Sequence, residues 1–341
     1  MSYSVVPPTL AQRVGRQEGM SLVRRDGLVA FPSYWQVPAA TEKAAYEAML
    51  ASRPSPTFDY YGFPWATIID GLRGDAPAAA KVLMALKHAV VTPAGTRKRV
   101  TVAQHIHAHQ FMELFKACGI TDLFWSHATH NHREIGGIRV HPFPLFPAQT
   151  PDASPEGDIA RPRRYLANFI GAYNPKIYLT NVREVIFRDM DKADDLLIIK
   201  RAEWHFDRAV YEEQIKGLRA NDQRMLIEQR HTEEYLNAIK DSWFTLCPSG
   251  SGPSSIRIFE SLCLGSIPIV LTRNLRLAGP QTLWEKAAII EDDSAAGYER
   301  AVSTARGKSS QDRIEMLRCG AKLASIVGPR NYAKFIIGMF H

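Results

Sequence analysis

The stretch between Trp243 and Leu271 constrains the fold more than any other part of the chain. It begins with an apolar run, Phe244–Cys247, that is typical of a buried strand, and continues into a loop, PSGSGP, with a turn residue at nearly every position. A serine can then cap a short helix whose apolar residues recur at helical spacing. After the glycine that ends this helix, Ile267–Leu271 is a second, β-branched run. The stretch therefore predicts a strand, a glycine loop, a helix and a parallel strand, which together form one βαβ unit.

The glycine loop has the composition of an anion-binding site. A glycine-rich turn that leads into a helix presents free backbone N–H groups and the positive end of the helix dipole, and both favour a phosphate group. Arg257 in the first helical turn adds a positive charge, and Glu260, one turn later on the same face, can accept hydrogen bonds from a ribose. The loop lacks the Gly-Lys-Ser/Thr ending of a P-loop and the clean Gly-x-Gly-x-x-Gly of a dinucleotide fingerprint. The spacing therefore fits either a metal-free site for a nucleoside diphosphate or a plain βαβ crossover with a surface Arg–Glu pair.

The segment CPSGSGPSSIRIFESLCLGSIPIVL resembles the exostosin-like glycosyltransferases, whose pattern is a Cys-Pro-x-Gly loop, then Ser-x-Arg-x-x-Glu-x-Leu, then Gly-x-Ile-Pro. The matching residues are Cys247, Pro248, Gly250, Ser255, Arg257, Glu260, Leu262, Gly265, Ile267 and Pro268. The resemblance continues weakly upstream through RRYLANFIGA and downstream through the acidic run at 291–293. It implies a GT-B fold, in which two Rossmann-like α/β domains with parallel sheets face a central cleft and the second domain binds the sugar nucleotide. It also implies a reaction that inverts the anomeric carbon.

The loop chemistry and the resemblance together predict the residues that bind the sugar nucleotide. These are Gly250, Ser251, Gly252, Ser254, Ser255, Arg257 and Glu260. The loop and Arg257 would stabilise the departing diphosphate in place of a divalent cation, so we expect no metal ion and no cofactor, the sugar nucleotide being a substrate. Five further polar residues near predicted strand-to-helix turns either reach phosphates or belong to the solvated surface: Asn174, Lys176, Arg183, Lys200 and Arg201.

A proline-rich segment divides the chain. Residues 141–163 carry six prolines, which predicts a stiff, extended linker. We therefore expect an N-terminal, acceptor-side domain at 1–155 and a C-terminal, nucleotide-sugar-binding domain at 156–327, with a last helix at 328–341 that packs back on the first domain. Alternating apolar runs and helical patterns predict a parallel sheet in each domain. The predicted helices lie at 41–51, 77–91, 110–118, 182–190, 211–218, 233–242, 295–305 and 311–325. The predicted strands lie at 65–70, 99–106, 120–126, 165–171, 196–200 and 287–291. The segment FDYYGFP at 58–64 is interpreted as an aromatic loop over a sugar or a hydrophobic lid over the core.

Histidines are concentrated in the first domain, where seven of the eleven lie between His105 and His141. If a strand ran through HIHAH at 105–109, three imidazoles would share one side, which is a geometry for zinc and supports a metal-dependent hydrolase as the alternative function. The other interpretation uses the carboxyl ends of two predicted strands, where ligands bind in open α/β sheets. A residue there can take a proton from an acceptor hydroxyl. The candidates for this base are His105, His127, Glu134, His130 and Asp70, of which we predict the first three as catalytic.

Charge and cysteine usage restrict the partners and the compartment. The formal net charge is +7, but the basic residues are scattered instead of forming the stripe that is common in nucleic-acid-binding proteins, so we expect no nucleic acid. The charge suits an anionic sugar nucleotide, and it is also compatible with peripheral contact with an anionic membrane. Four cysteines far apart in the sequence predict reduced thiols, not a disulfide framework. Without a signal peptide or a run of about eighteen apolar residues, the sequence predicts a cytoplasmic protein or one at the inner face of the membrane.

We therefore expect an exostosin-like hexosyl- or pentosyltransferase of GT-B fold. Its predicted substrates are a sugar nucleotide and a glycan or lipid-linked glycan acceptor, and the expected role is the synthesis of a bacterial surface polysaccharide such as lipopolysaccharide or capsule.

Overall fold

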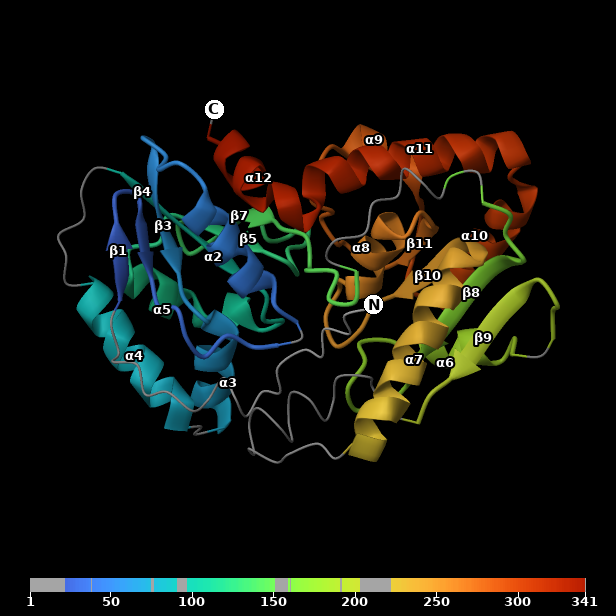
Figure 1. Cartoon of the computed structure of the whole chain (residues 1–341), viewed down its shortest axis with the longest axis horizontal. Coiled ribbons are helices and arrows are strands. Elements are labelled where there is room, and N and C mark those ends of the chain that lie inside the picture. The colour runs from blue at the N-terminus through green and yellow to red at the C-terminus, as the bar shows by residue number, and fades with distance from the viewer. Residues whose placement is uncertain are drawn as a thin grey trace, which may run out of the picture.

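The computed structural model describes residues 22–37, 39–74, 77–90, 97–150, 159, 161–190, 192–202 and 222–340. They form two α/β units that lie side by side, each built on its own sheet (Figure 1). The two sheets have seven and five strands within this described part of the chain.

The first sheet is mainly parallel. Its strand order is β1-β2-β3-β4-β5-β7-β6, and only the two edge pairs, β1 with β2 and β6 with β7, are antiparallel. The strands are β1 (Val23–Arg25), β2 (Leu28–Ala30), β3 (Phe58–Gly62), β4 (Lys98–Ala103), β5 (Asp122–Trp125), β6 (Glu134–Ile135) and β7 (Ile138–Pro142). The carboxyl ends of β4 and β5 therefore meet at one edge, and the loops that follow them carry most of the histidines.

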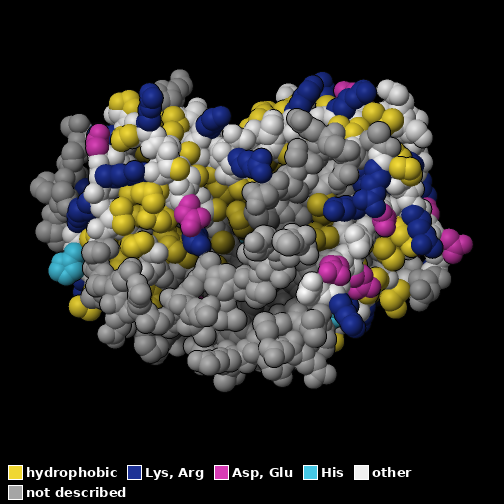
Figure 2. Space-filling model, in the orientation of Figure 1, with side chains coloured by type: hydrophobic (Ala, Val, Ile, Leu, Met, Phe, Trp, Pro, Cys, Tyr) yellow, Lys and Arg dark blue, Asp and Glu magenta, His cyan; other side chains and the backbone are white. Residues whose placement is uncertain are grey.

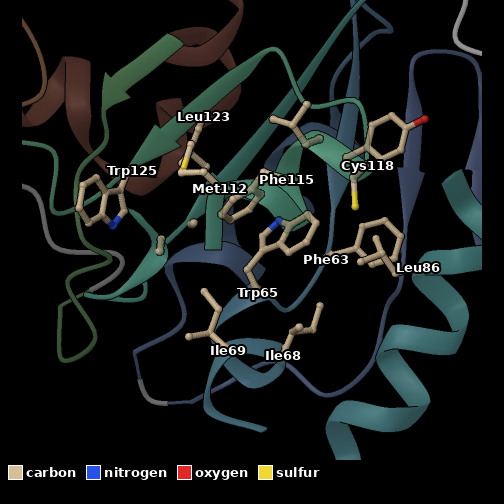
Figure 3. Packing of buried hydrophobic residues seen from close by; sticks show 14 of the residues in the cluster. Phe63, Trp65, Ile68, Ile69, Leu86, Met112, Phe115, Cys118, Leu123 and Trp125 are labelled. Atoms are coloured by element: carbon tan, nitrogen blue, oxygen red, sulfur yellow. The ribbon is translucent and has the colours of Figure 1, made fainter. Parts of the chain in front are cut away.

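Helices cover both faces of this sheet because its central strands alternate between two cores. Val100 and Val102 face α2 (Thr41–Ala51) and α12 (Tyr332–Gly338). Ala103 and Trp125 face the other side, with α3 (Trp65–Gly74), α4 (Pro77–Val90) and α5 (Met112–Ala117), as Figure 3 shows for the residues around Trp65. A strand with both faces buried is expected of a parallel sheet.

One strand of this sheet was predicted in the wrong place. The segment 65–70, predicted as a strand, is the first part of α3, and FDYYGFP, interpreted as a loop or a lid, contains β3. Phe58 and Tyr60 point to one core, and Tyr61 to the other, which is the alternation of a buried strand. Trp65 and Ile69 recur at helical spacing in a core helix, so the β-branched residues of WATIID do not decide its conformation.

The second sheet is parallel throughout, with the order β12-β11-β10-β8-β9. Its strands are β8 (Tyr165–Gly171), β9 (Leu196–Lys200), β10 (Ser242–Pro248), β11 (Ile267–Leu271) and β12 (Ile289–Glu291). The helices around it are α6 (Val182–Phe187), α7 (Asp222–Lys240), α8 (Ile256–Cys263), α9 (Gln281–Ala287), α10 (Ala295–Gly307) and α11 (Ser310–Val327). The α/β class and the parallel sheets predicted for both halves of the chain are confirmed.

The C-terminal segment returns to the first sheet. After α11 the chain forms a 3-10 turn (Pro329–Asn331) and α12, which lies beside the first unit (Figure 1). The Phe340 ring packs 4.9 Å from the Phe58 ring, and the Tyr332 ring 4.8 Å from that of Phe143. The domain boundary near residue 155 stays a prediction because residues 151–158 lie outside the described part of the chain, as does the helix predicted at 211–218.

On the face drawn in Figure 2, Lys and Arg side chains are scattered over both halves. In the described part of the chain, no helix combines the length and the apolar character needed to cross a membrane.

Candidate functional site

The glycine loop at 249–255 leaves the carboxyl end of β10 and leads into α8, as its turn residues and the following apolar helix predict. The hydrogen bonds that hold its first half include those from Arg183 Nε to the Ser249 carbonyl (3.0 Å), from Leu179 N–H to the Gly250 carbonyl (3.0 Å), and from Gly250 N–H to the Gly252 carbonyl (3.0 Å). Ser255 occupies the N-cap position of α8, but its side chain makes no capping hydrogen bond. The loop therefore lies at the edge of the sheet where α/β proteins bind ligands, next to a helix N-terminus without a side-chain cap.

Two arginines converge beside this loop. Arg257 donates from Nη2 to the Ile170 carbonyl (2.7 Å), and its guanidinium lies over the Phe169 ring, 4.8 Å from the centroid. Arg183 also donates from Nη1 to the Ala172 carbonyl (3.1 Å). A Cβ added to Gly171 would lie 3.5 Å from a terminal nitrogen of each arginine, so the two guanidinium groups are neighbours on either side of this glycine.

The arginine pair has positive charge that the described residues do not neutralise. Neither guanidinium forms an ion pair within the described part of the chain, and Arg257 Nε and Nη1 are buried there without a hydrogen-bond partner. Burial, followed by the charge of Arg257, lowers the pKa of Arg183 to about 10, so Arg183 is still charged at neutral pH. Two adjacent cations, one of them with unused hydrogen-bond donors, form a site for an anion with several oxygens. Charge-assisted hydrogen bonds to a phosphate would neutralise the positive charge and use the buried donors.

The second half of the loop contacts the first unit. Ser254 N–H points at Nδ1 of His127 (3.4 Å). A Cβ on Gly252 would come within 2.6 Å of the same nitrogen and 2.7 Å of Cγ2 of Ile106, so only glycine fits there. Main-chain hydrogen bonds reinforce the contact, from His130 N–H to the Asn274 carbonyl (2.8 Å) and from Arg276 N–H to the Ala128 carbonyl (2.9 Å). Of the predicted donor-binding residues, Gly252 and Ser254 thus lie at the seam between the two units, whereas Gly250 lies nearest the arginines and Ser251 is exposed.

Glu260 is engaged inside the protein. It is buried, and its Oε2 accepts a hydrogen bond from the Tyr235 hydroxyl (2.6 Å) while Oε1 accepts one from Gln149 N–H (3.2 Å). Burial raises the pKa of Glu260 above its usual value, against the opposing effect of the Tyr235 hydroxyl. The surface Arg–Glu pair that the spacing also allowed is therefore not formed. Each carboxylate oxygen of Glu260 already accepts one hydrogen bond inside the protein, and its contact with a ribose stays a prediction.

His105 follows β4 and forms a dyad with Asp70 of α3. Its Nε2 lies 2.9 Å from Oδ1 of Asp70, and its Nδ1 accepts the His107 N–H (3.1 Å). Because Nδ1 is an acceptor, we assign the ring proton to Nε2, facing the carboxylate. Both ring nitrogens are thus engaged, although the dyad fixes the orientation of the imidazole as an orienting carboxylate does in catalytic sites.

His127 follows β5 and is buried between the two units. Burial, helped by the positive potential of His105 and opposed by a hydrogen bond to the Gln104 carbonyl, lowers the pKa of His127 to about 3. The ring is therefore neutral near pH 7 and joins the loop after β4 to the glycine loop.

Glu134 lies at another place in the first sheet. In β6 it faces Arg139, and Arg139 in turn faces Asp122, the first residue of β5. The carboxylate is therefore near the amino ends of the central strands, whereas His105 and His127 follow their carboxyl ends. The structure brings the two histidines together at the seam but does not bring Glu134 to them.

The histidine-rich segment does not form the geometry on which a zinc site was considered. The strand β4 ends at Ala103, so HIHAH is not an extended strand. The His109 ring packs against the Trp125 ring (5.3 Å) and stacks on that of His132 (5.5 Å), and Nε2 of His141 lies 2.9 Å from Oδ1 of the buried Asp122. Among the residues that the structure describes, no group of three or more His, Cys, Asp or Glu side chains is placed to hold a metal ion. The cysteines are all free and buried, as predicted.

The sequence alone allows two roles for Arg183, a phosphate ligand or a solvated surface residue. The structure buries it beside Arg257. Its position in a helix just after a turn was the available signal, but the 74 positions between Arg183 and Arg257 gave no indication that the two arginines meet.

Comparisons with known proteins agree with the resemblance drawn from the glycine loop. A model of the Exostosin GT47 domain matches residues 97–296. The chain is 36% identical over 62 residues to "Probable glucuronoxylan glucuronosyltransferase IRX7" of Arabidopsis thaliana, and 27% identical over 158 residues to "Exostosin-1 homolog" of Caenorhabditis elegans. These matches cover 18% and 46% of this chain, and 14% and 39% of those proteins. The chain thus spans less than half the length of the curated relatives it matches.

The chain matches three solved structures, among others, at low sequence identity. Sucrose-phosphate synthase of Thermosynechococcus elongatus has a TM-score of 0.40 at 11% identity, covering 77% of this chain and 70% of that one. The trehalose 6-phosphate synthase of Burkholderia multivorans has a TM-score of 0.41 at 11% identity, covering 88% and 73%. TarM has a TM-score of 0.43 at 8% identity, covering 78% and 53%.

Proposed function

The chain belongs to the exostosin GT47 family, whose model matches more than half of it, and from this premise we propose that it is a glycosyltransferase that moves a sugar from a sugar nucleotide to a glycan acceptor. In this reaction an acceptor hydroxyl oxygen attacks the anomeric carbon of the donor sugar. The bond between that carbon and the diphosphate oxygen breaks, the nucleoside diphosphate leaves, and a base takes the hydroxyl proton.

The observation that carries the proposal is the pair Arg183 and Arg257 beside the glycine loop. The departing diphosphate carries more negative charge on its bridging oxygen in the transition state than in the bound donor, so fixed cations there lower the barrier. Arg257 has two buried nitrogens without a hydrogen-bond partner within the described chain, and a terminal nitrogen of each arginine lies 3.5 Å from the position that a Cβ on Gly171 would take. Two guanidinium groups supply the charge that a divalent cation supplies elsewhere, which supports a reaction without a metal ion.

The first unit supplies the base in this proposal. His105 and His127 remain the predicted candidates at the seam together with Glu134, but each of the two imidazoles already uses both nitrogens. His107 adjoins them and is half-buried, and no hydrogen bond to its ring is formed within the described residues. Burial, then the charge of Arg73, lowers the pKa of His107, so its ring is neutral and able to accept a proton near pH 7. We therefore add His107 to the candidate bases.

The finer predictions have less support. Inversion at the anomeric carbon follows from the family alone. The acceptor, predicted as a bacterial lipopolysaccharide or capsule chain, has no support from the two curated relatives, which are eukaryotic. The cytoplasmic location and the peripheral membrane contact likewise stay predictions.

The experiment that tests the proposal measures binding of UDP, GDP, CMP, dTDP and ADP by thermal shift and calorimetry, with EDTA present. The variants are Arg257→Met and Arg183→Met, and the control is Arg300→Met, an exposed arginine paired with Glu291. One nucleotide should stabilise the wild type. In each site variant the affinity for this nucleotide should fall roughly ten- to hundredfold, because one charge-assisted hydrogen bond is lost. The control variant should bind the nucleotide as tightly as the wild type.

Two outcomes would contradict the proposal. If no nucleotide binds the wild type, the site is not a sugar-nucleotide site. If a nucleotide binds Arg257→Met as tightly as the wild type, the diphosphate does not lie at the arginine pair. The melting temperature of each variant without ligand separates a loss of binding from a loss of folding, which matters for Arg183 because it also holds the Ser249 and Ala172 carbonyls.

A further inference from the structure

Asp293 is a buried carboxylate at the same edge of the second sheet as the arginine pair. It is the second residue after β12 and is 2% exposed. Its Oδ2 accepts hydrogen bonds from the hydroxyl of Ser249, the first residue of the glycine loop, and from the hydroxyl of Thr180 (2.9 Å). The carbonyl of the same Ser249 accepts a hydrogen bond from Arg183, so Ser249 is hydrogen-bonded both to the Asp293 carboxylate and to one arginine of the pair.

The other carboxylate oxygen of Asp293, Oδ1, accepts no hydrogen bond from the residues that the structure describes. Asp293 Oδ1 is buried, and it is the one carboxylate oxygen in the described part of the chain that is buried without a hydrogen-bond partner. A buried acceptor without a partner costs free energy, and native proteins rarely keep one unless a ligand or water satisfies it. Burial raises the pKa of Asp293, while the hydroxyls of Ser249 and Thr180, and then Arg183, oppose this effect.

The carboxylate expected to hold a donor hydroxyl was Glu260, and the structure gives both of its oxygens to Tyr235 and Gln149. The site therefore has cations for a diphosphate, while the carboxylate expected to accept from a sugar hydroxyl is engaged inside the protein. Asp293 supplies an acceptor beside the same glycine loop.

We propose that Asp293 binds the sugar nucleotide, with Oδ1 accepting a hydrogen bond from a sugar hydroxyl next to the diphosphate. This inference rests on the proposed function. Hydroxyl groups flank the diphosphate on both sides, on the ribose and on the transferred sugar, and both present the same chemistry to a carboxylate. A carboxylate oxygen accepts and cannot donate, so it selects hydroxyls over the carbonyl oxygens of a base.

The test is calorimetric titration of the full chain with UDP, GDP, their 2′-deoxy forms, UDP-glucose and GDP-mannose. Asp293→Asn keeps the size of the side chain and removes its charge. Asp292→Asn is the matched control, because this neighbouring carboxylate is 69% exposed and lies 3.7 Å from Arg300. Thr180→Val keeps Asp293 intact but removes one hydroxyl that holds it, and so measures how much binding depends on the position of the loops alone.

Asp293→Asn should weaken binding roughly tenfold or more, as expected for one hydrogen bond to a charged group, with Asp292→Asn within twofold of the wild type and Thr180→Val within threefold. A loss already present with UDP or GDP, and absent for the 2′-deoxy form, identifies the ribose as the bound group. A loss that appears only with UDP-glucose or GDP-mannose identifies the transferred sugar.

Equal affinity of Asp293→Asn and the wild type for every ligand would overturn the inference and leave the proposed function intact. An equal loss in Thr180→Val would also overturn it, because Asp293 would then act only by holding the loops. If the wild type binds none of these ligands, the proposed function fails and this inference fails with it.

Discussion

Replacing Gly252 with alanine tests whether the glycine loop and the first unit pack as tightly as the structure shows. The added Cβ would lie 2.6 Å from Nδ1 and 2.8 Å from Cε1 of the buried His127 ring, and 2.7 Å from Cγ2 of Ile106. The backbone of Gly252 is not in the left-handed region, so alanine meets no dihedral penalty there and the effect comes from this contact.

The expected cost combines two terms. Overpacking a well-packed contact costs about 1–3 kcal/mol, because the ring or the loop must move. The hydrogen bond from Ser254 N–H to His127 lies in the same contact, and its loss adds about 0.5–1.5 kcal/mol. Gly252→Ala should therefore destabilise the protein by about 1.5–4.5 kcal/mol, the sum of these two terms.

The assay is chemical denaturation followed by fluorescence, with Gly250→Ala as the control. A Cβ on Gly250 has its nearest neighbour, Arg183 Nη2, at 4.0 Å, which is an ordinary contact. The double variant Gly252→Ala with His127→Ala removes the clashing ring, so the two changes should cost less together than the sum of the single variants, by about 1 kcal/mol or more. Strictly additive effects, or equal stability of Gly252→Ala and Gly250→Ala, would refute the seam contact described here.

Two other predictions concern the histidines. On folding, the pKa of His127 falls from its ordinary value near 6.5 to about 3, so between these pH values the unfolded chain binds this proton and the folded chain does not. The free energy of unfolding therefore decreases as the pH falls through this window, by up to about 1.4 kcal/mol per pH unit. In thermal unfolding between pH 7 and pH 4, His127→Gln should reduce this dependence, and an unchanged profile would contradict the buried neutral ring. His107→Gln should slow the release of nucleoside diphosphate roughly a hundredfold while nucleotide binding is kept, whereas His130→Gln, at an exposed histidine, should not. A normal rate in His107→Gln would leave the base to another group.

The sequence by itself determined the elements whose side-chain pattern is local. The βαβ unit around the glycine loop, the helix at 41–51 and the strands at 165–171 and 196–200 lie where they were predicted, because their apolar period and end signals agree. It also indicated Arg257, since a glycine loop and an arginine in the first helical turn form an anion site from adjacent residues. The family followed from the same segment.

The tertiary structure decided what depends on contacts between distant segments. Between 58 and 70, both stretches are apolar, and only pairing with β2 and β4 selects 58–62 as the strand. The state of Glu260 is set by Tyr235 and Gln149, which lie 25 and 111 residues away. His127 and Ser254 meet across 127 residues. Periodicity and capping report on neighbours within a few residues, whereas the burial, the hydrogen-bond partners and the charge of a site depend on which strands and helices pack together, so the occupied Glu260, the free Oδ1 of Asp293 and the paired arginines are visible only in the folded chain.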